Sequence, residues 1–169
     1  MARVAGQWCV AVLLMLGMAG IARRACAQTP IVAVAVVQPG VAVLGTRTLD
    51  FGNVFPGVDK TIGIGSGTAG LYRIDGADNA PVSLSFTLPS NLVRTAGGNL
   101  LPISSWTALH NEENDPSSGV NFTPSAASTG IILGLVGRRW VFIGATVSPA
   151  VNQLQGTYSA VATLSVVYM

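Results

Sequence analysis

The feature that most constrains this chain is a series of short apolar runs with period two, separated by Gly, Pro and Asn. After the first 27 residues, no apolar stripe at helical spacing lasts for three turns. The cleanest alternation is Val82–Leu88, where apolar residues alternate with Ser83, Ser85 and Thr87. Such alternation is typical of strands with one face on a core and one near water. The sequence therefore predicts an all-β, immunoglobulin-like antiparallel sandwich.

Further strands are expected along the rest of the chain, at Lys60–Ile64, Leu71–Gly76, Leu101–Leu109, Ile131–Val136 and Arg139–Val147. A turn near Gly137 is expected to join the last two of these. In the final one, Val141, Ile143, Ala145 and Val147 share a face. The pattern shows no internal repeat and no second domain boundary.

The first 27 residues have the pattern of a secretory signal peptide. Arg3 supplies a positive start, Trp8–Ala22 form an apolar run, and Ala25–Ala27 offer small residues before a cleavage point at Gln28. The run is shorter than the ~18 residues usually needed to span a bilayer. We therefore expect an exported chain, in the periplasm, at the cell surface or outside the cell, without a transmembrane segment after cleavage.

Removal of the signal peptide changes the charge and the cysteine count. The chain has nine basic and seven acidic residues; losing Arg3, Arg23 and Arg24 leaves six basic residues, and a formal charge of +2 becomes −1. This charge gives no basis for nucleic-acid binding. Cys9 and Cys26 also leave, which excludes a cysteine nucleophile and a thiolate metal site.

No catalytic, cofactor or metal site is expected, and the chain is not expected to be an enzyme. Gly65–Gly70 matches the dinucleotide fingerprint in letters, but a strand follows where a helix is needed. His110, the only histidine, has no nucleophile elbow near it and is interpreted as a solvated loop residue. The acidic loop Asn111–Gly119 carries consecutive carboxylates, which do not converge on calcium as alternate positions do, and its role stays open.

The segment Thr29–Leu44 is apolar on both faces and is broken at Pro39-Gly40. Two interpretations are open: an ordinary first strand, or an extension that completes a neighbouring subunit. The expected organisation is a signal peptide at 1–27, this strand or donor extension at 28–45, and the sandwich at 46–169. The candidate donor-strand residues are Ile31, Val32, Ala33, Val34, Ala35 and Val36.

The stretch Gly156–Met169 is expected to form a strand with one wholly apolar face, made of Tyr158, Ala160, Ala162, Leu164, Val166 and Tyr168. Gly156 is the 14th residue from the end and Tyr168 the penultimate one. This glycine, the alternating apolar residues and the penultimate tyrosine resemble the C-terminal motif of chaperone–usher pilus subunits.

Further segments resemble an uncharacterised bacterial family of pilin-like surface domains, and fimbrial and spore-coat subunits share the general pattern. These segments are Leu49–Gly52, Ala69–Gly76, Leu84–Pro89, Ile143–Val147 and Asn152–Tyr158. The resemblance implies a structural or adhesive surface subunit, with a periplasmic chaperone and neighbouring subunits as partners. It also implies that the assembly and chaperone-recognition strand comprises Gly156, Tyr158, Ala160, Ala162, Leu164, Val166 and Tyr168.

An incomplete sandwich would leave an unpaired edge, and a strand donated by a partner would satisfy it. Donor-strand exchange in a fimbria-like polymer is therefore one expectation. The alternative is a self-complete, monomeric carbohydrate-binding or adhesive module. That module would need its first strand in its own sheet and a cluster of exposed aromatics, for which Tyr72, Trp106 and Trp140 are the candidates.

Overall fold

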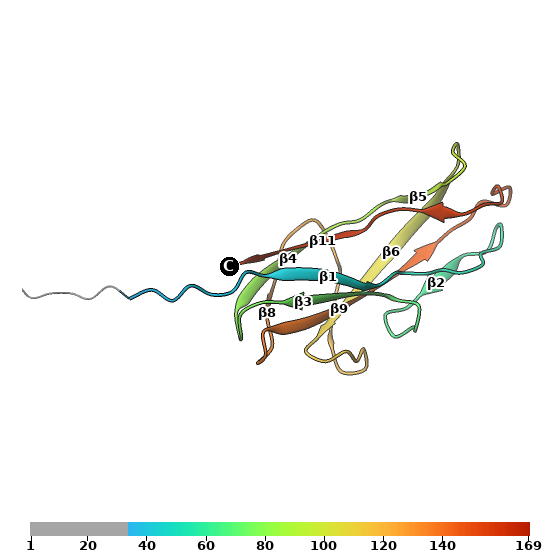
Figure 1. Ribbon diagram of the computed structural model, residues 1–169. Helices are drawn as coiled ribbons and strands as arrows, with labels where there is room; N and C mark the ends of the chain where they lie inside the picture. Colours follow the sequence, from blue (N-terminus) through green and yellow to red (C-terminus); the bar gives the residue numbers. More distant parts are fainter. Residues whose placement is uncertain (1–33) are drawn as a thin grey trace, which may run out of the picture. The chain divides into compact units, whose positions relative to one another are not determined.

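The computed structural model describes residues 34–169, of which residues 37–169 form one compact unit, an antiparallel β-sandwich without a helix (Figure 1). The all-β sandwich expected from the sequence is confirmed. The expected signal peptide and the donor candidates Ile31, Val32 and Ala33 lie outside the described residues. The strands are β1 (Ala42–Arg47), β2 (Lys60–Ile62), β3 (Gly70–Asp75), β4 (Pro81–Thr87), β5 (Asn91–Arg94), β6 (Leu100–Asn111), β7 (Val120–Phe122), β8 (Thr129–Ile132), β9 (Arg138–Val147), β10 (Tyr158–Ser159) and β11 (Thr163–Tyr168).

The strands form two sheets of unequal size. The larger sheet has the order β1-β3-β9-β6-β5-β10, with β2 pairing to β9 and β7 pairing to β6. The smaller sheet has three strands in the order β11-β4-β8. All strand pairs are antiparallel. Strand β9 is central, because it pairs with β2, β3 and β6.

The main core lies between the two sheets and follows the predicted alternation. On β4, Val82, Leu84 and Phe86 are buried, while the residues between them are not. The cluster that they form contains Ile74, Val82, Leu84, Phe86, Ala108, Ile131, Leu133, Val141, Ile143 and Leu164.

A second core cluster lies further along the large sheet and contains Leu101, Ile103, Ala145 and Val147. Side chains from the small sheet do not cover it. Its partly buried neighbours come from the segment before β2 and from β5, β6 and β10: Leu49, Phe51, Val54, Leu92, Trp106 and Tyr158. This end of the sandwich therefore has a large sheet without an opposing small sheet.

The outer face of the large sheet carries a third apolar cluster. Leu71, Leu109 and Phe142 are buried there, with Ile64 and Trp140 packed against them. Strand β9 is thus buried on both faces, whereas the sequence pattern indicated one face. The second burial arises because Ile64, in the connection after β2, packs over this side of the sheet.

The strand expected at Arg139–Val147 forms, whereas the one expected at Ile131–Val136 is shifted to Thr129–Ile132, and the two lie in different sheets. Strand β8 pairs with β4, and β9 pairs with β3, so the turn between them carries the chain from the small sheet to the large one. Gly137 in this turn has φ of +64°. A Cβ there would collide with the Gly76 carbonyl oxygen, so the position requires glycine.

The apolar N-terminal segment is only partly a strand. Ala42–Gly45 pair with β3, as an ordinary first strand would. Residues 34–41 belong to no strand. Val34 and Val36 are 81% and 77% exposed.

Leu84 tests the inter-sheet core. It is fully buried, so Leu84→Ala removes buried methyl groups and leaves a cavity. We expect a loss of about 2–5 kcal/mol in the free energy of unfolding, measured by urea titration. The exposed Val167→Ala is the control, with an expected change within about 0.5 kcal/mol. Equal effects of the two changes would contradict this description of the core.

Candidate functional site: a groove between the first and last strands

A groove of about 1080 Å³ lies between the segments 45–56 and 153–162. Its lining is mainly apolar and includes the partly buried shell of the second core cluster. The apolar and aromatic lining residues are Leu49, Phe51, Val54, Phe55, Tyr72, Leu92, Leu101, Ile103, Trp106, Ile143, Leu154, Tyr158, Ala160, Val161 and Ala162.

The groove exists because two neighbouring chain segments change sheets at the same end of the small sheet, next to the Thr87–Thr163 pair. Strand β4 of the small sheet ends at Thr87, and the chain then enters β5 of the large sheet. Strand β10 pairs with β5, and after residues 160–162 the chain enters β11 of the small sheet. The small sheet ends where Thr87 pairs with Thr163. Beyond that pair the inner face of the large sheet has no opposing strand.

Within residues 34–169, β1, whose residues 45–47 line the groove, and β11, which begins just beyond the groove at Thr163, each have one free edge. Strand β1 pairs with β3 on one side, and β11 pairs with β4 on one side. Residues 160–162 pair with neither sheet. Free edges next to an apolar groove provide both backbone hydrogen-bonding groups and a surface for alternate side chains, which are the two requirements for strand addition.

Tyr72 limits the groove at one end. Its hydroxyl donates a hydrogen bond of 2.7 Å to the Ala162 carbonyl, across from β3 to the segment before β11. Burial raises the pKa of Tyr72, so the phenol stays protonated and remains a donor. On the side of Tyr72 away from the groove, Val41 packs against the main core. The groove is therefore closed toward the start of β1 and extends toward Pro56 and Gln153.

The predicted C-terminal strand is interrupted, but its apolar face is oriented as expected. Ala162, Leu164 and Val166 pack on the main core, and Tyr158 packs on the second cluster. Ala160 is exposed and lines the groove. The interruption at residues 160–162 is the change of sheet, which the alternation could not reveal because it continues through this point.

Gly156 lies before β10 and has a structural requirement for glycine. Its φ is +147°, and a Cβ would lie 2.7 Å from the Arg94 Nε. That Nε donates a hydrogen bond of 3.0 Å to the Gln155 carbonyl. Glycine here lets Arg94 hold the chain just before it joins β5.

Tyr168 joins three segments through its hydroxyl. The Ala77 amide donates to this oxygen at 2.8 Å, and the hydroxyl donates to the Pro39 carbonyl at 2.8 Å. A Cβ on Gly76 would lie 2.7 Å from the same oxygen. Although Tyr168 is 36% exposed, its hydroxyl is already used within the chain. It fixes the end of β11 to the chain entering β1.

The three candidate aromatics for a sugar platform do not come together. Tyr72 and Trp106 line the groove on the inner face. Trp140 packs on the third cluster, on the outer face of the large sheet. The aromatic cluster that the alternative required is therefore not formed by these residues.

His110 is placed differently from the expectation of a solvated loop residue. It lies on β6, half-buried, with its ring 5.7 Å from that of Phe122, and its Nδ1 is buried without a hydrogen-bond partner. In the adjacent loop Asp115 accepts hydrogen bonds from Ser117.

Among residues 34–169, no group of three His, Cys, Asp or Glu side chains could hold a metal ion, and no helix could span a membrane.

The groove lining overlaps the predicted C-terminal strand only at residues 156–162, and its other wall, residues 45–56, was not expected from the sequence. In residues 45–56, the only period-two pattern of apolar residues is the pair Leu49 and Phe51. The part of this stretch after Arg47 belongs to no strand. The sequence feature that could have indicated this wall is the presence of apolar side chains next to turn residues such as Pro56-Gly57. Trp106, a candidate for sugar stacking from the sequence alone, packs between the first two core clusters.

Tyr168→Phe should loosen the junction of the three segments. It removes the donor to Pro39 and leaves the Ala77 amide without its acceptor, so we expect a loss of about 1–2 kcal/mol. Hydrogen exchange should show faster exchange of the Ala77 amide. Unchanged protection of that amide would contradict the junction.

His110 should make the fold less stable in mild acid. Burial, and then the nearby positive charge of Arg139, lower its pKa below the usual 6.5. The unfolded chain therefore binds the proton more readily, and stability should fall as pH falls below about 6.5. We expect urea midpoints to decline from pH ~8 to pH ~5, and His110→Phe to reduce this decline. An identical decline in the variant would contradict the assignment.

The chain is similar to a chain of known structure. A chain from a structure of a chaperone–usher pilus, described in terms of the molecular basis of rod uncoiling, is 17% identical with a TM-score of 0.38. The match covers 85% of this chain and 97% of that chain. No protein-family model matches the chain. No curated protein matches it.

Proposed function

We propose that this chain is an exported structural or adhesive surface subunit, completed by a strand from a neighbouring chain. The donated strand would lie between β1 and the segment β10–β11. The observation that carries the proposal is the apolar groove, which lies beside the free edge of β1 and the unpaired residues 160–162. The role is structural and not enzymatic.

The groove has the chemistry that a donated strand needs. Fifteen of its lining residues are apolar or aromatic, and several of them belong to the second core cluster or pack against it. Filling the groove would remove this apolar surface from water, which stabilises a complex by about 25 cal/mol for each Å² buried. The same insertion would pair backbone groups along β1 and the β10–β11 segment.

The chain itself carries a segment of matching chemistry. Residues 31–37 are Ile-Val-Ala-Val-Ala-Val-Val, without charge and with β-branched residues at five of the seven positions. Within the described part of this segment, Val34, Val36 and Val37 are exposed. An apolar donor of this kind in one subunit and a groove in the next would support a fimbria-like polymer. Before assembly, a periplasmic chaperone would supply the missing strand.

Introducing a charged side chain on one face of the donor at a time shows which face enters the groove. In a strand, Val34 and Ala35 point to opposite faces, so only one of them would enter the groove. We expect one of Val34→Asp and Ala35→Asp to abolish oligomers of the chain that starts at Gln28, and the other to leave them intact. Size-exclusion chromatography with light scattering measures this. Equal effects, or a wild-type monomer, would contradict strand donation.

Complementation between two defective variants provides a sharper test. Ala160→Arg would block the groove and leave the donor intact, whereas the sensitive Asp variant would have an intact groove. Neither should polymerise alone, and a mixture of the two should form a one-to-one complex. Ser165→Arg, on the exposed face of β11 outside the groove, is the matched control and should behave as wild type. Failure of the mixture to form a complex would count against the proposal.

A further inference from the structure

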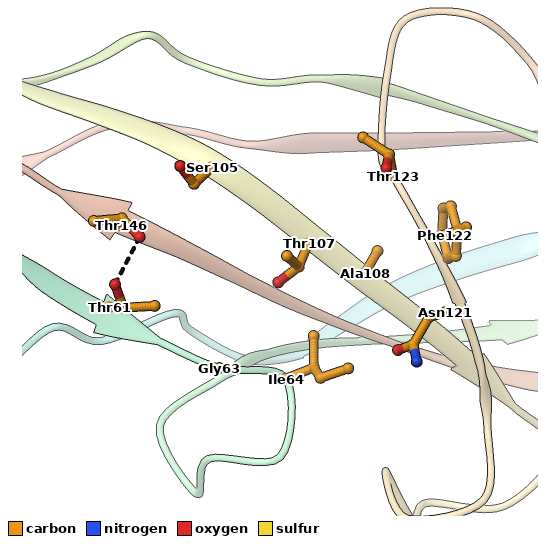
Figure 2. A pocket seen from close by; sticks show the side chains of 10 residues that line it. All are labelled: Thr61, Gly63, Ile64, Ser105, Thr107, Ala108, Asn121, Phe122, Thr123 and Thr146. Carbon is orange, nitrogen blue, oxygen red and sulfur yellow. Dashed lines mark hydrogen bonds between the residues drawn. The ribbon is translucent and has the colours of Figure 1, made fainter.

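A second hollow lies on the opposite, outer face of the large sheet. Its volume is about 620 Å³, within the range of small-molecule sites. It shares no lining residue with the groove. Strand β2 and the chain after it form one wall, β6 crosses beneath it, and β7 forms the other wall (Figure 2).

The polar groups of the hollow are uncharged. They include the hydroxyls of Thr61, Thr107 and Thr146 and the amide of Asn121, and no lining residue carries a charge. The Thr61 and Thr146 hydroxyls share a hydrogen bond of 2.7 Å (Figure 2). Within residues 34–169, the Thr107 hydroxyl and the Asn121 amide have no side-chain hydrogen bond to the protein. Ile64 also lines the hollow and offers an apolar contact (Figure 2).

The backbone around the hollow has two unusual features. A bulge separates Ser104 from Thr107 where β6 pairs with β9, and Ser105 within it has φ of +52°. Opposite Thr107 is Gly144, where a Cβ would collide with the Ile62 carbonyl oxygen and lie 3.0 Å from the Thr107 hydroxyl. A non-glycine residue in the left-handed region costs about 1–3 kcal/mol and is found more often at binding sites.

We propose that this hollow binds one ring of a neutral saccharide. An apolar ligand would leave the Thr107 and Asn121 groups without partners, at a free-energy cost. A phosphate, a carboxylate or a cation would find no opposite charge in the lining. A pyranose ring offers several hydroxyls to these groups and a C–H face to Ile64. The site would let the subunit contact a glycan while its groove takes part in assembly.

Chemical-shift titration tests the site directly. The probes are the methyl glycosides of mannose, galactose and N-acetylglucosamine, added to the isotope-labelled chain that starts at Gln28. We expect at least one to give saturable shifts at the amides of residues 61–64, 105–107 and 121–123, with a dissociation constant on the order of 1 mM. No saturable shift with any of the three, or shifts centred on residues 160–162, would overturn the proposal.

Matched variants separate binding from folding. Thr107→Val keeps the side-chain shape and removes the hydroxyl, and it should weaken binding about fivefold by losing one hydrogen bond. Thr87→Val makes the same change on β4, away from the hollow, and should leave the affinity unchanged. Equal affinities of both variants would overturn the site. Stronger binding of glucose 6-phosphate than of the neutral glycosides would overturn the ligand class.

Discussion

The structure depends on an imbalance between two apolar surfaces. Strands β6 and β9 are long, and the inner face of β9 is apolar from Val141 to Val147. The small sheet that should cover them ends at the Thr87–Thr163 pair. Apolar surface left in water costs about 25 cal/mol per Å², so the remaining chain folds over it as far as it can. The segments 48–56 and 149–159 do this incompletely, and the groove is the part that stays uncovered.

The strands were more predictable than the groove. The alternation at Val82–Leu88 identified β4 because one-sided burial leaves a period-two pattern in the sequence. The same logic found one face of β9 and missed Phe142, because its cover comes from Ile64, which is distant in sequence.

The groove could not be predicted, since no local pattern marks a change of sheet. Residues 160–162 read like the strand residues on either side of them, yet they pair with neither sheet. The lining joins Tyr72, Trp106 and Ala162, which only the strand order brings together. His110 shows the same limit, because an acidic neighbouring loop gave no indication of the Phe122 ring beside it.

The residues behind the resemblance to pilus subunits also have roles inside this chain. Gly156 is required by its backbone angle and by Arg94, and the Tyr168 hydroxyl is used by Ala77 and Pro39. A motif kept for internal folding and a motif kept for partner recognition would look alike in sequence. These internal hydrogen bonds do not prevent strand pairing at the free edge of β11. The hydrogen bonds are made by the Arg94 and Tyr168 side chains, whereas strand pairing would use the backbone groups of β11.

The bond between Tyr168 and Pro39 has a consequence for symmetry. It fixes the entry of β1 at the end of the sandwich where β4 begins, whereas the groove extends toward the other end, where β10 pairs with β5 (Figure 1). Giving and receiving a strand would then use two different surfaces. Contacts of this heterologous kind repeat without closing into a twofold dimer. An array built on them would be polar, with a free donor at one tip and an empty groove at the other.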